Sequence, residues 1–128
     1  MKILIVDGDE VFAPVLKEKL EKERFDVEIE KSGDAAFDRA KNVKPDLIAM
    51  ELVLPGKDGF DVLEDLKANT RLNSVPVVIV ATTSDDESIK RALASGAANY
   101  FSKIQHPVEE IVDAIKEHLL LHGGKKES

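Results

Sequence analysis

The sequence predicts an α/β domain in which helices cover both faces of a parallel sheet. Three observations point to this fold class. Short continuous apolar runs alternate with amphipathic stretches along the chain, the alternation gives five strand–helix units, and no unit repeats another. Strands that alternate with helices are typical of βαβ units, whose crossovers bring successive strands into parallel alignment. The 128 residues suit one such domain.

The first three strands and two helices are predicted from the spacing of apolar side chains. Residues 3–6 form a continuous apolar run, as expected for a strand covered on both faces. Residues 10–22 carry apolar side chains at helical spacing, and residues 25–30 alternate between apolar and acidic side chains. That alternation indicates one wet face and hence an edge strand. A weaker helix over residues 33–41 leads to a third strand, which ends at Glu51.

Caps and helix breakers outline the second half of the chain. Asp58 is a suitable N-cap for a third helix, and residues 77–81 form a fourth strand. The capping box from Ser84 to Glu87 predicts the start of a fourth helix. The remaining features are a stop for that helix near Gly96, a short strand over residues 99–101, and a last helix that opens at Pro107 and closes at Gly123 and Gly124.

Composition excludes several classes of protein. The chain has no cysteine, so it forms no disulfide and no zinc–thiolate site. No apolar run approaches the roughly 20 residues that span a bilayer, and the N-terminus meets an acid too early for a secretory signal. The net charge of −7 argues against autonomous nucleic-acid binding. We expect a cytoplasmic domain over residues 1–122, with residues 123–128 as a polar C-terminal tail or the start of a linker.

Ionisable side chains gather where the predicted strands end. In a parallel sheet, ligand chemistry takes place outside the carboxyl ends of the strands. The residues at those ends are Asp7, Gly8, Asp9, Glu51, Ala81, Thr82 and Lys103. We expect Glu51 and Lys103 to form an ion pair, and Asp9 to cap the first helix. Where a strand continues, successive side chains point to opposite faces, so Thr82 is expected to turn away from the site.

Five groups of residues resemble, in order, the motifs of response-regulator receiver domains. They are Ile3 to Asp7, Pro45 to Ile48, Leu54 to Phe60, Val75 to Ile79, and Ser95 to Ala97 with Tyr100 and Lys103. The resemblance covers about residues 2–121. It implies a flavodoxin-like fold, a doubly wound parallel sheet of five strands in the order 2-1-3-4-5, flanked by five helices. It also implies a role in two-component, phosphorelay signal transduction.

The resemblance implies a role for each residue at the strand ends. In receiver domains, two acids after the first strand and an aspartate after the third hold Mg²⁺, and the aspartate accepts a phosphoryl group. A hydroxyl after the fourth strand and a lysine after the fifth contact that group, and an aromatic residue on the fifth strand rotates. Asp7, Lys103 and Tyr100 match this pattern, whereas Ile104 replaces the proline that usually follows the lysine.

Three further departures remove parts of one mechanism. Gly8 stands at the second acid, Glu51 at the phospho-acceptor and Ala81 at the hydroxyl. The extra methylene of Glu51 moves its carboxylate outward by roughly 1.5 Å, and a misplacement of about that size can lower a rate a hundredfold. We therefore expect a pseudo-receiver that is not an enzyme and works without phosphorylation, by protein–protein contact. No resident cofactor is expected, and at most weak Mg²⁺ binding at Asp7 and Glu51.

The expected contact face is the one that the family uses, made by the fourth helix, the fifth strand and the fifth helix. The candidate residues there are Lys90, Arg91, Tyr100 and Lys116. The expected partner is a protein, either a histidine kinase, an output protein or a motility protein, and a homodimer through the same face is a second option. No nucleic acid and no membrane are expected as partners.

Other functions are weighed against this reading. The first is a conventional Mg²⁺-dependent receiver that is phosphorylated on Glu51. The second is a Mg²⁺-dependent phosphatase, because Asp7-Gly8-Asp9 resembles the DxD motif in which the first aspartate is the nucleophile and the second the general acid. A flavin or nucleotide binder is disfavoured, because the chain has no glycine-rich phosphate loop. The three histidines are interpreted as cap, helix-end and tail residues, at His106, His118 and His122.

Overall fold

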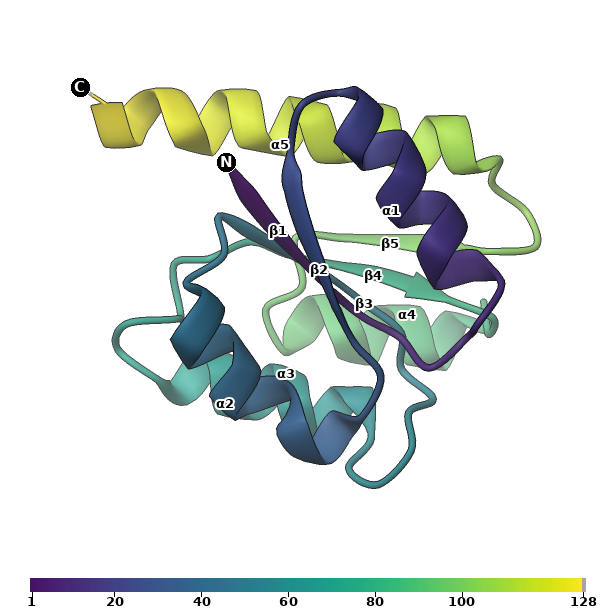
Figure 1. Ribbon diagram of the computed structural model, residues 1–128. Helices are drawn as coiled ribbons and strands as arrows, with labels where there is room; N and C mark the ends of the chain where they lie inside the picture. Colours follow the sequence, from purple (N-terminus) through teal and green to yellow (C-terminus); the bar gives the residue numbers. More distant parts are fainter. Residues whose placement is uncertain (128) are drawn as a thin grey trace.

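Five parallel strands form one sheet in the order β2-β1-β3-β4-β5 (Figure 1). The computed structural model describes the backbone of residues 1–127 and the side chains of residues 1–121. The strands are β1 (Lys2–Val6), β2 (Asp26–Glu30), β3 (Leu47–Met50), β4 (Val77–Ala81) and β5 (Asn99–Ser102). The predicted fold class and strand order are confirmed. The alternating strand, β2, lies at an edge of the sheet, as its pattern indicated.

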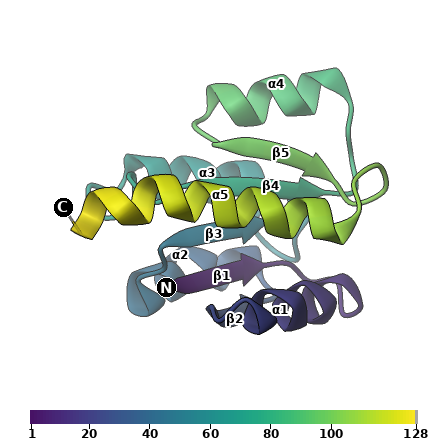
Figure 2. The ribbon, with the colours of Figure 1, turned by 90° about the horizontal axis from the view of Figure 1, so that it is seen from above.

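Helices cover both faces of the sheet. They are α1 (Phe12–Lys22), α2 (Gly33–Val43), α3 (Gly59–Ala68), α4 (Asp86–Ala94) and α5 (Val108–Glu127). In Figure 1, α1 and α5 lie above the sheet, and α2, α3 and α4 lie below it. Figure 2 shows that α4 sits beside β5, at the edge opposite β2. All the strands run in the same direction, so their carboxyl ends and the loops that follow share one side of the molecule.

The sheet separates two hydrophobic clusters, and the strands contribute to them alternately. In β3, Ile48 and Met50 belong to the cluster under α2, α3 and α4, whereas Leu47 and Ala49 belong to the cluster under α1 and α5. This period of two is the one that a strand imposes. All four side chains are buried, so both faces of β3 are covered. Burying an aliphatic side chain of this size contributes roughly 1.5–3 kcal/mol.

Side chains cap α2, α3 and α4, and one of these caps differs from the expectation. Ser32 and Asp58 accept hydrogen bonds from the first turns of α2 and α3, so the predicted role of Asp58 is confirmed. The capping box at Ser84 is wrong, because the N-cap of α4 is Asp85, whose carboxylate accepts from the backbone N–H of Ser88. Aspartate and serine are both strong N-cap residues. The pattern therefore located the helix but left its first residue open.

Helix α5 is longer than the sequence suggests. It continues to Glu127, past the two glycines that were expected to end it. A glycine inside a helix costs only about 1 kcal/mol relative to alanine, so a glycine pair alone does not stop a helix. The side chains of residues 122–127, His122 included, and the whole of residue 128 lie outside the described residues, and the proposed boundary at residue 122 stays a prediction. No helix within the described part of the chain could cross a membrane.

Two loops at the carboxyl side of the sheet touch backbone to backbone. The backbone N–H of Gly33, the first residue of α2, donates to the carbonyl oxygen of Pro55 in the loop after β3. A Cβ at position 33 would lie only 1.6 Å from the carbonyl oxygen of Lys57. Glycine is therefore the residue that this close approach allows. The contact joins the start of α2 to the loop that carries the residues after Glu51.

Candidate functional site

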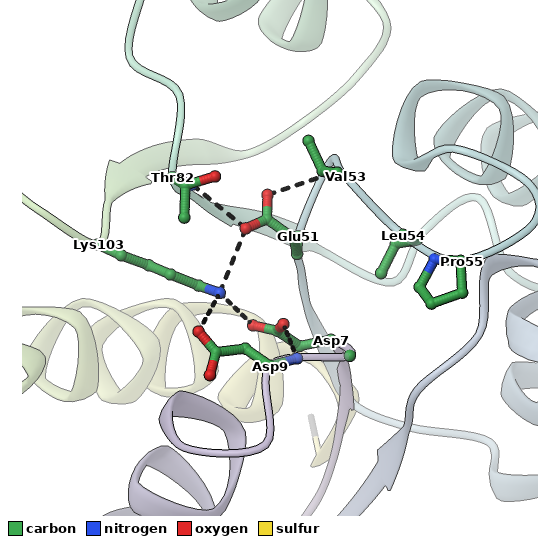
Figure 3. A pocket seen from close by; sticks show the side chains of 9 residues that line it. Asp7, Asp9, Glu51, Val53, Leu54, Pro55, Thr82 and Lys103 are labelled. Atoms are coloured by element: carbon green, nitrogen blue, oxygen red, sulfur yellow. Dashed lines mark hydrogen bonds and ion pairs between the residues drawn. The ribbon is translucent and has the colours of Figure 1, made fainter.

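The loops after β1, β3, β4 and β5 line an open cavity at the carboxyl ends of the strands (Figure 3). Its volume is about 520 Å³. The lining residues are Asp7, Gly8, Asp9, Glu51, Val53, Leu54, Pro55, Thr82 and Lys103. The fold thus brings together the acids and the lysine that the sequence places at separate strand ends.

Lys103 is the centre of the site. Its ammonium lies 2.8 Å from a carboxylate oxygen of Asp7, 3.2 Å from one of Glu51 and 3.5 Å from one of Asp9. The ammonium is also 4.7 Å from the centre of the Phe12 ring, a cation–π contact. The Lys103 side chain is only 7% exposed. One cation therefore faces three carboxylates in a buried position, and the expected ion pair between Glu51 and Lys103 is present.

Both carboxylate oxygens of Glu51 are engaged. One oxygen, Oε2, accepts from the backbone N–H groups of Leu52 at 2.6 Å and Val53 at 3.3 Å. The other, Oε1, accepts from the backbone N–H of Thr82 at 3.2 Å and pairs with Lys103. The residue is 4% exposed. The longer side chain of glutamate thus folds back onto the loop after β3 and does not project into solvent.

The two aspartates after β1 differ in environment. Burial raises the pKa of Asp7, although a hydrogen bond from Lys103 opposes the shift. Hydrogen bonds from the backbone N–H groups of Phe12 and Val11 lower the pKa of Asp9. Asp9 thereby holds the first turn of α1, in agreement with its expected cap role. Burial alone would lower the pKa of Lys103, but its contacts with the acids outweigh burial, so the pKa is raised and the side chain stays charged at neutral pH.

The residues that line the site do not fit a magnesium ion. Mg²⁺ requires near-octahedral oxygen ligands. Gly8 supplies none, and a Cβ there would lie 3.2 Å from the carbonyl oxygen of Lys31 and 3.3 Å from the Pro55 side chain, so a larger residue at position 8 would be tightly packed. Asp7 and Glu51 already accept from N–H groups and from Lys103. Among the described residues, no three His, Cys, Asp or Glu side chains are placed to hold one metal ion.

The loop after β4 connects the site to Tyr100. Strand β4 ends at Ala81, and Thr82 lines the cavity, so the expectation that its side chain turns away is wrong. The alternation fails because the chain leaves the strand at that residue. The hydroxyl of Tyr100 donates to the carbonyl oxygen of Thr83 at 2.7 Å and lies 3.3 Å from the Thr83 hydroxyl. Sequence reasoning passed over the carbonyl oxygen of Thr83 and the amides that hold Glu51, since backbone groups leave no sequence signal.

The four residues proposed for the partner face do not lie together. Lys90 is exposed on α4, and Tyr100 is half-buried on β5. The guanidinium of Arg91 stacks 4.0 Å from the Phe60 ring, at the junction of α3 and α4. The ammonium of Lys116 pairs with Glu23 at 2.6 Å, which turns it toward the end of α1. Of the four, only Lys90 and Tyr100 remain as candidates on the face made by α4, β5 and α5.

The molecule is a small α/β domain with a buried lysine–carboxylate site at the carboxyl ends of its strands. Comparisons with known proteins specify its family. The family model for the response regulator receiver domain matches residues 3–116. The chain therefore belongs to the response regulator receiver domain family, a component of two-component signal transduction.

Individual relatives agree with this assignment. The chain is 33% identical over 118 residues to the DNA-binding response regulator MtrA of Mycobacterium tuberculosis, and the match covers 92% of this chain and 50% of MtrA. It is 30% identical over 111 residues to the response regulator PleD of Caulobacter vibrioides, and the match covers 87% of this chain and 24% of PleD. The chain thus spans half or less of the length of these curated relatives.

Solved structures show the same fold over nearly the whole chain. A CheY-like receiver domain protein from Methanospirillum hungatei has a TM-score of 0.87 and 26% identity, and the match covers 99% of this chain and 98% of that one. The beryllofluoride-activated N-terminal receiver domain of RstA from Klebsiella pneumoniae has a TM-score of 0.81 and 30% identity, with 95% and 97% covered. These likenesses favour the receiver reading over a phosphatase with Asp7 as nucleophile.

Proposed function

We propose that this chain is a pseudo-receiver, a receiver domain that signals by protein–protein contact without being phosphorylated and without acting as an enzyme. The observation that carries the proposal is the state of the Glu51 carboxylate. Both of its oxygens are bonded to N–H donors or to Lys103, and the residue is 4% exposed. A carboxylate that attacks a phosphoryl donor needs an oxygen that is free and reachable.

The donor set supports the same conclusion. Phosphoryl transfer depends on positioning and on cations that neutralise the developing charge. Gly8 and the engaged acids leave no arrangement that fits Mg²⁺, and Ala81 has no hydroxyl with which to contact a phosphoryl oxygen. Each of these residues removes a different part of the mechanism, so restoring one of them leaves the others missing.

Glu51 instead supplies a permanent negative charge to the loop after β4. Its carboxylate binds the backbone N–H of Thr82, and the next residue, Thr83, holds the hydroxyl of Tyr100. A phosphate would bring nearly two negative charges to such a position, whereas glutamate brings one. We infer that the resting protein keeps one arrangement of this loop and offers it constantly to its partner.

The experiment is phosphorylation with acetyl phosphate and Mg²⁺, read by Phos-tag electrophoresis. We expect no shifted band for the natural protein, and none for Glu51→Asp, because position 8 still lacks an acid. An aspartate-bearing receiver domain treated in parallel is the positive control. A stoichiometric acid-stable, hydroxylamine-labile phosphate on residue 51 of the natural protein would show that the proposal is wrong.

A reconstruction tests which part is limiting. The triple variant Gly8→Asp, Glu51→Asp, Ala81→Thr restores the three missing groups, at the expense of a tight contact at position 8. We expect phosphorylation to appear only when the acids at positions 8 and 51 are both present. Ready phosphorylation of Glu51→Asp alone would show that one methylene was the sole defect.

A further inference from the structure

A second cavity lies at the opposite ends of the strands, near the first residues of β3 and β4. It is bounded by the end of α2 and by the loop between α3 and β4, and its volume is about 530 Å³. Cavities of roughly 300–1,000 Å³ are typical of small-molecule sites. The residues that matter for its chemistry are Lys41, Lys44, Arg71, Pro45, Leu72 and Val75.

The cavity carries a surplus of positive charge in an acidic protein. Lys41, Lys44 and Arg71 line it, and no acid does. Throughout the described chain, none of these three cations has a carboxylate within ion-pair distance, whereas Lys31 and Lys57 do. Basic side chains also complement a helix C-terminus, which carries about half a negative charge. The ends of α2 and α3 thus account for about one of the three charges, and about two remain unmatched.

The floor of the cavity is apolar and its wall is held in place. Pro45, Leu72 and Val75 are buried. The side-chain oxygen of Asn69 accepts from the backbone N–H of Leu72 at 3.1 Å, which fixes the turn after α3. The ammonium of Lys67 donates to the carbonyl oxygen of Val75 at 2.9 Å. A ligand would therefore meet a preformed shape, which lowers the entropy lost on binding.

We propose that this cavity binds a small phosphate-bearing organic molecule of mononucleotide size. The fork of Arg71 and the ammonium of Lys44 would hold the phosphate, because guanidinium groups pair with phosphate through two parallel hydrogen bonds. The ring system would lie against Leu72 and Val75. The chain has no glycine-rich loop, so side chains rather than backbone amides carry this recognition. The cavity's size favours a small molecule over an acidic protein segment, which would need a larger surface.

The test is a titration of the isotope-labelled protein with adenosine monophosphate, adenosine and inorganic phosphate, followed by amide chemical shifts. We expect saturable shifts for the nucleotide at residues 41–45 and 69–75. Adenosine and phosphate alone should bind at least about tenfold more weakly, about 1.4 kcal/mol each. Equal binding of phosphate and nucleotide would reduce the cavity to a simple anion site and overturn the proposal. So would tighter binding of an acidic peptide, or the absence of saturable shifts.

Variants locate the site and separate it from the function proposed above. Arg71→Gln and Lys44→Asn should each weaken nucleotide binding about tenfold; asparagine suits position 44, where φ is 54°. Lys17→Gln on α1 is the matched control and should bind as the natural protein does. Glu51→Gln should also leave nucleotide binding unchanged, because Glu51 lies at the carboxyl ends of the strands and the second cavity lies at their amino ends. Unchanged binding in the Arg71 and Lys44 variants would contradict the proposal.

Discussion

Glu51 shows how one methylene group changes what a side chain reaches. The extra carbon–carbon bond, about 1.5 Å long, lets the carboxylate turn back and accept hydrogen bonds from the backbone of the next two residues. The same oxygens stay close enough to pair with Lys103 at 3.2 Å. The side chain is therefore satisfied within the protein, which is the usual condition for a buried charge.

Loss of the Lys103 ammonium should destabilise the folded protein strongly. Lys103→Met leaves the carboxylates of Asp7 and Glu51 buried and unpaired, and breaking a buried ion pair from one side typically costs about 3–5 kcal/mol. We expect a loss of this size in urea unfolding at neutral pH. Lys90→Met is the matched control, because Lys90 is exposed, and it should change stability by less than about 0.5 kcal/mol.

The deficit of Lys103→Met should depend on pH. The hydrogen bond from Lys103 now lowers the pKa of Asp7, so removing it raises that pKa further above the ordinary value. A raised folded-state pKa favours the folded protein at low pH, and this advantage is lost as pH rises through the folded pKa. The difference from the natural protein should therefore shrink as the pH falls from neutral into the acid range. A deficit that stays constant or grows on acidification would contradict this account of the site.

At the scale of elements, the start of α4 distinguishes two neighbouring caps. Asp85 accepts from the backbone N–H of Ser88, whereas Ser84 precedes the cap. Asp85→Ala should cost about 0.5–2 kcal/mol, and Ser84→Ala should stay within about 0.5 kcal/mol. Thermal unfolding of the two variants measures the difference. The reverse order of effects would restore the capping box that the sequence suggested.

Titration of the Tyr100 hydroxyl reports on the loop between β4 and α4. Tyr100 is the only tyrosine in the chain, which has no tryptophan. Burial raises its pKa, the hydrogen bond with Thr83 opposes the shift, and the charges of Asp85 and Glu51 raise it further. An ultraviolet titration of the folded protein should give a midpoint above the ordinary value. Asp85→Asn and Glu51→Gln should each lower that midpoint. A midpoint at or below the ordinary tyrosine value, or one insensitive to residue 51, would argue against a link between the site and Tyr100.

At the scale of the molecule, the poor fit between Mg²⁺ and the described residues of the site has a thermodynamic consequence. A ligand that binds the folded state at tenfold its dissociation constant stabilises it by about 1.4 kcal/mol. We expect Mg²⁺ at concentrations of about 10 mM to leave the thermal midpoint unchanged relative to a sodium salt of equal ionic strength. A rise of several degrees that is specific to the divalent ion would show that the acids do bind a cation.

Most of the fold follows from periodicity, and parts of the site do not. Strand and helix patterns depend on side chains, so they are visible along the chain, as at β2 with its one wet face. The convergence of Asp7, Glu51 and Lys103 follows from parallel topology, because their strand ends share one edge. The backbone amides around Glu51 are not visible, since every residue but proline has one. Thr82 and Arg91 were misplaced because their orientation depends on where a strand ends and on which neighbour a long side chain finds.

The backbone contact at Gly33 gives the molecule a second route for transmitting strain. The first residue of α2 is hydrogen-bonded and closely packed against the loop that follows Glu51, so a movement of that loop would also move the helix. A partner that binds over the carboxyl ends of the strands would thus displace α2 through Gly33 and, through Thr83, also displace Tyr100. The loops of the site thus contact two separate elements, α2 through Gly33 and β5 through Tyr100. Replacing Gly33 would disrupt the first contact and leave the second intact.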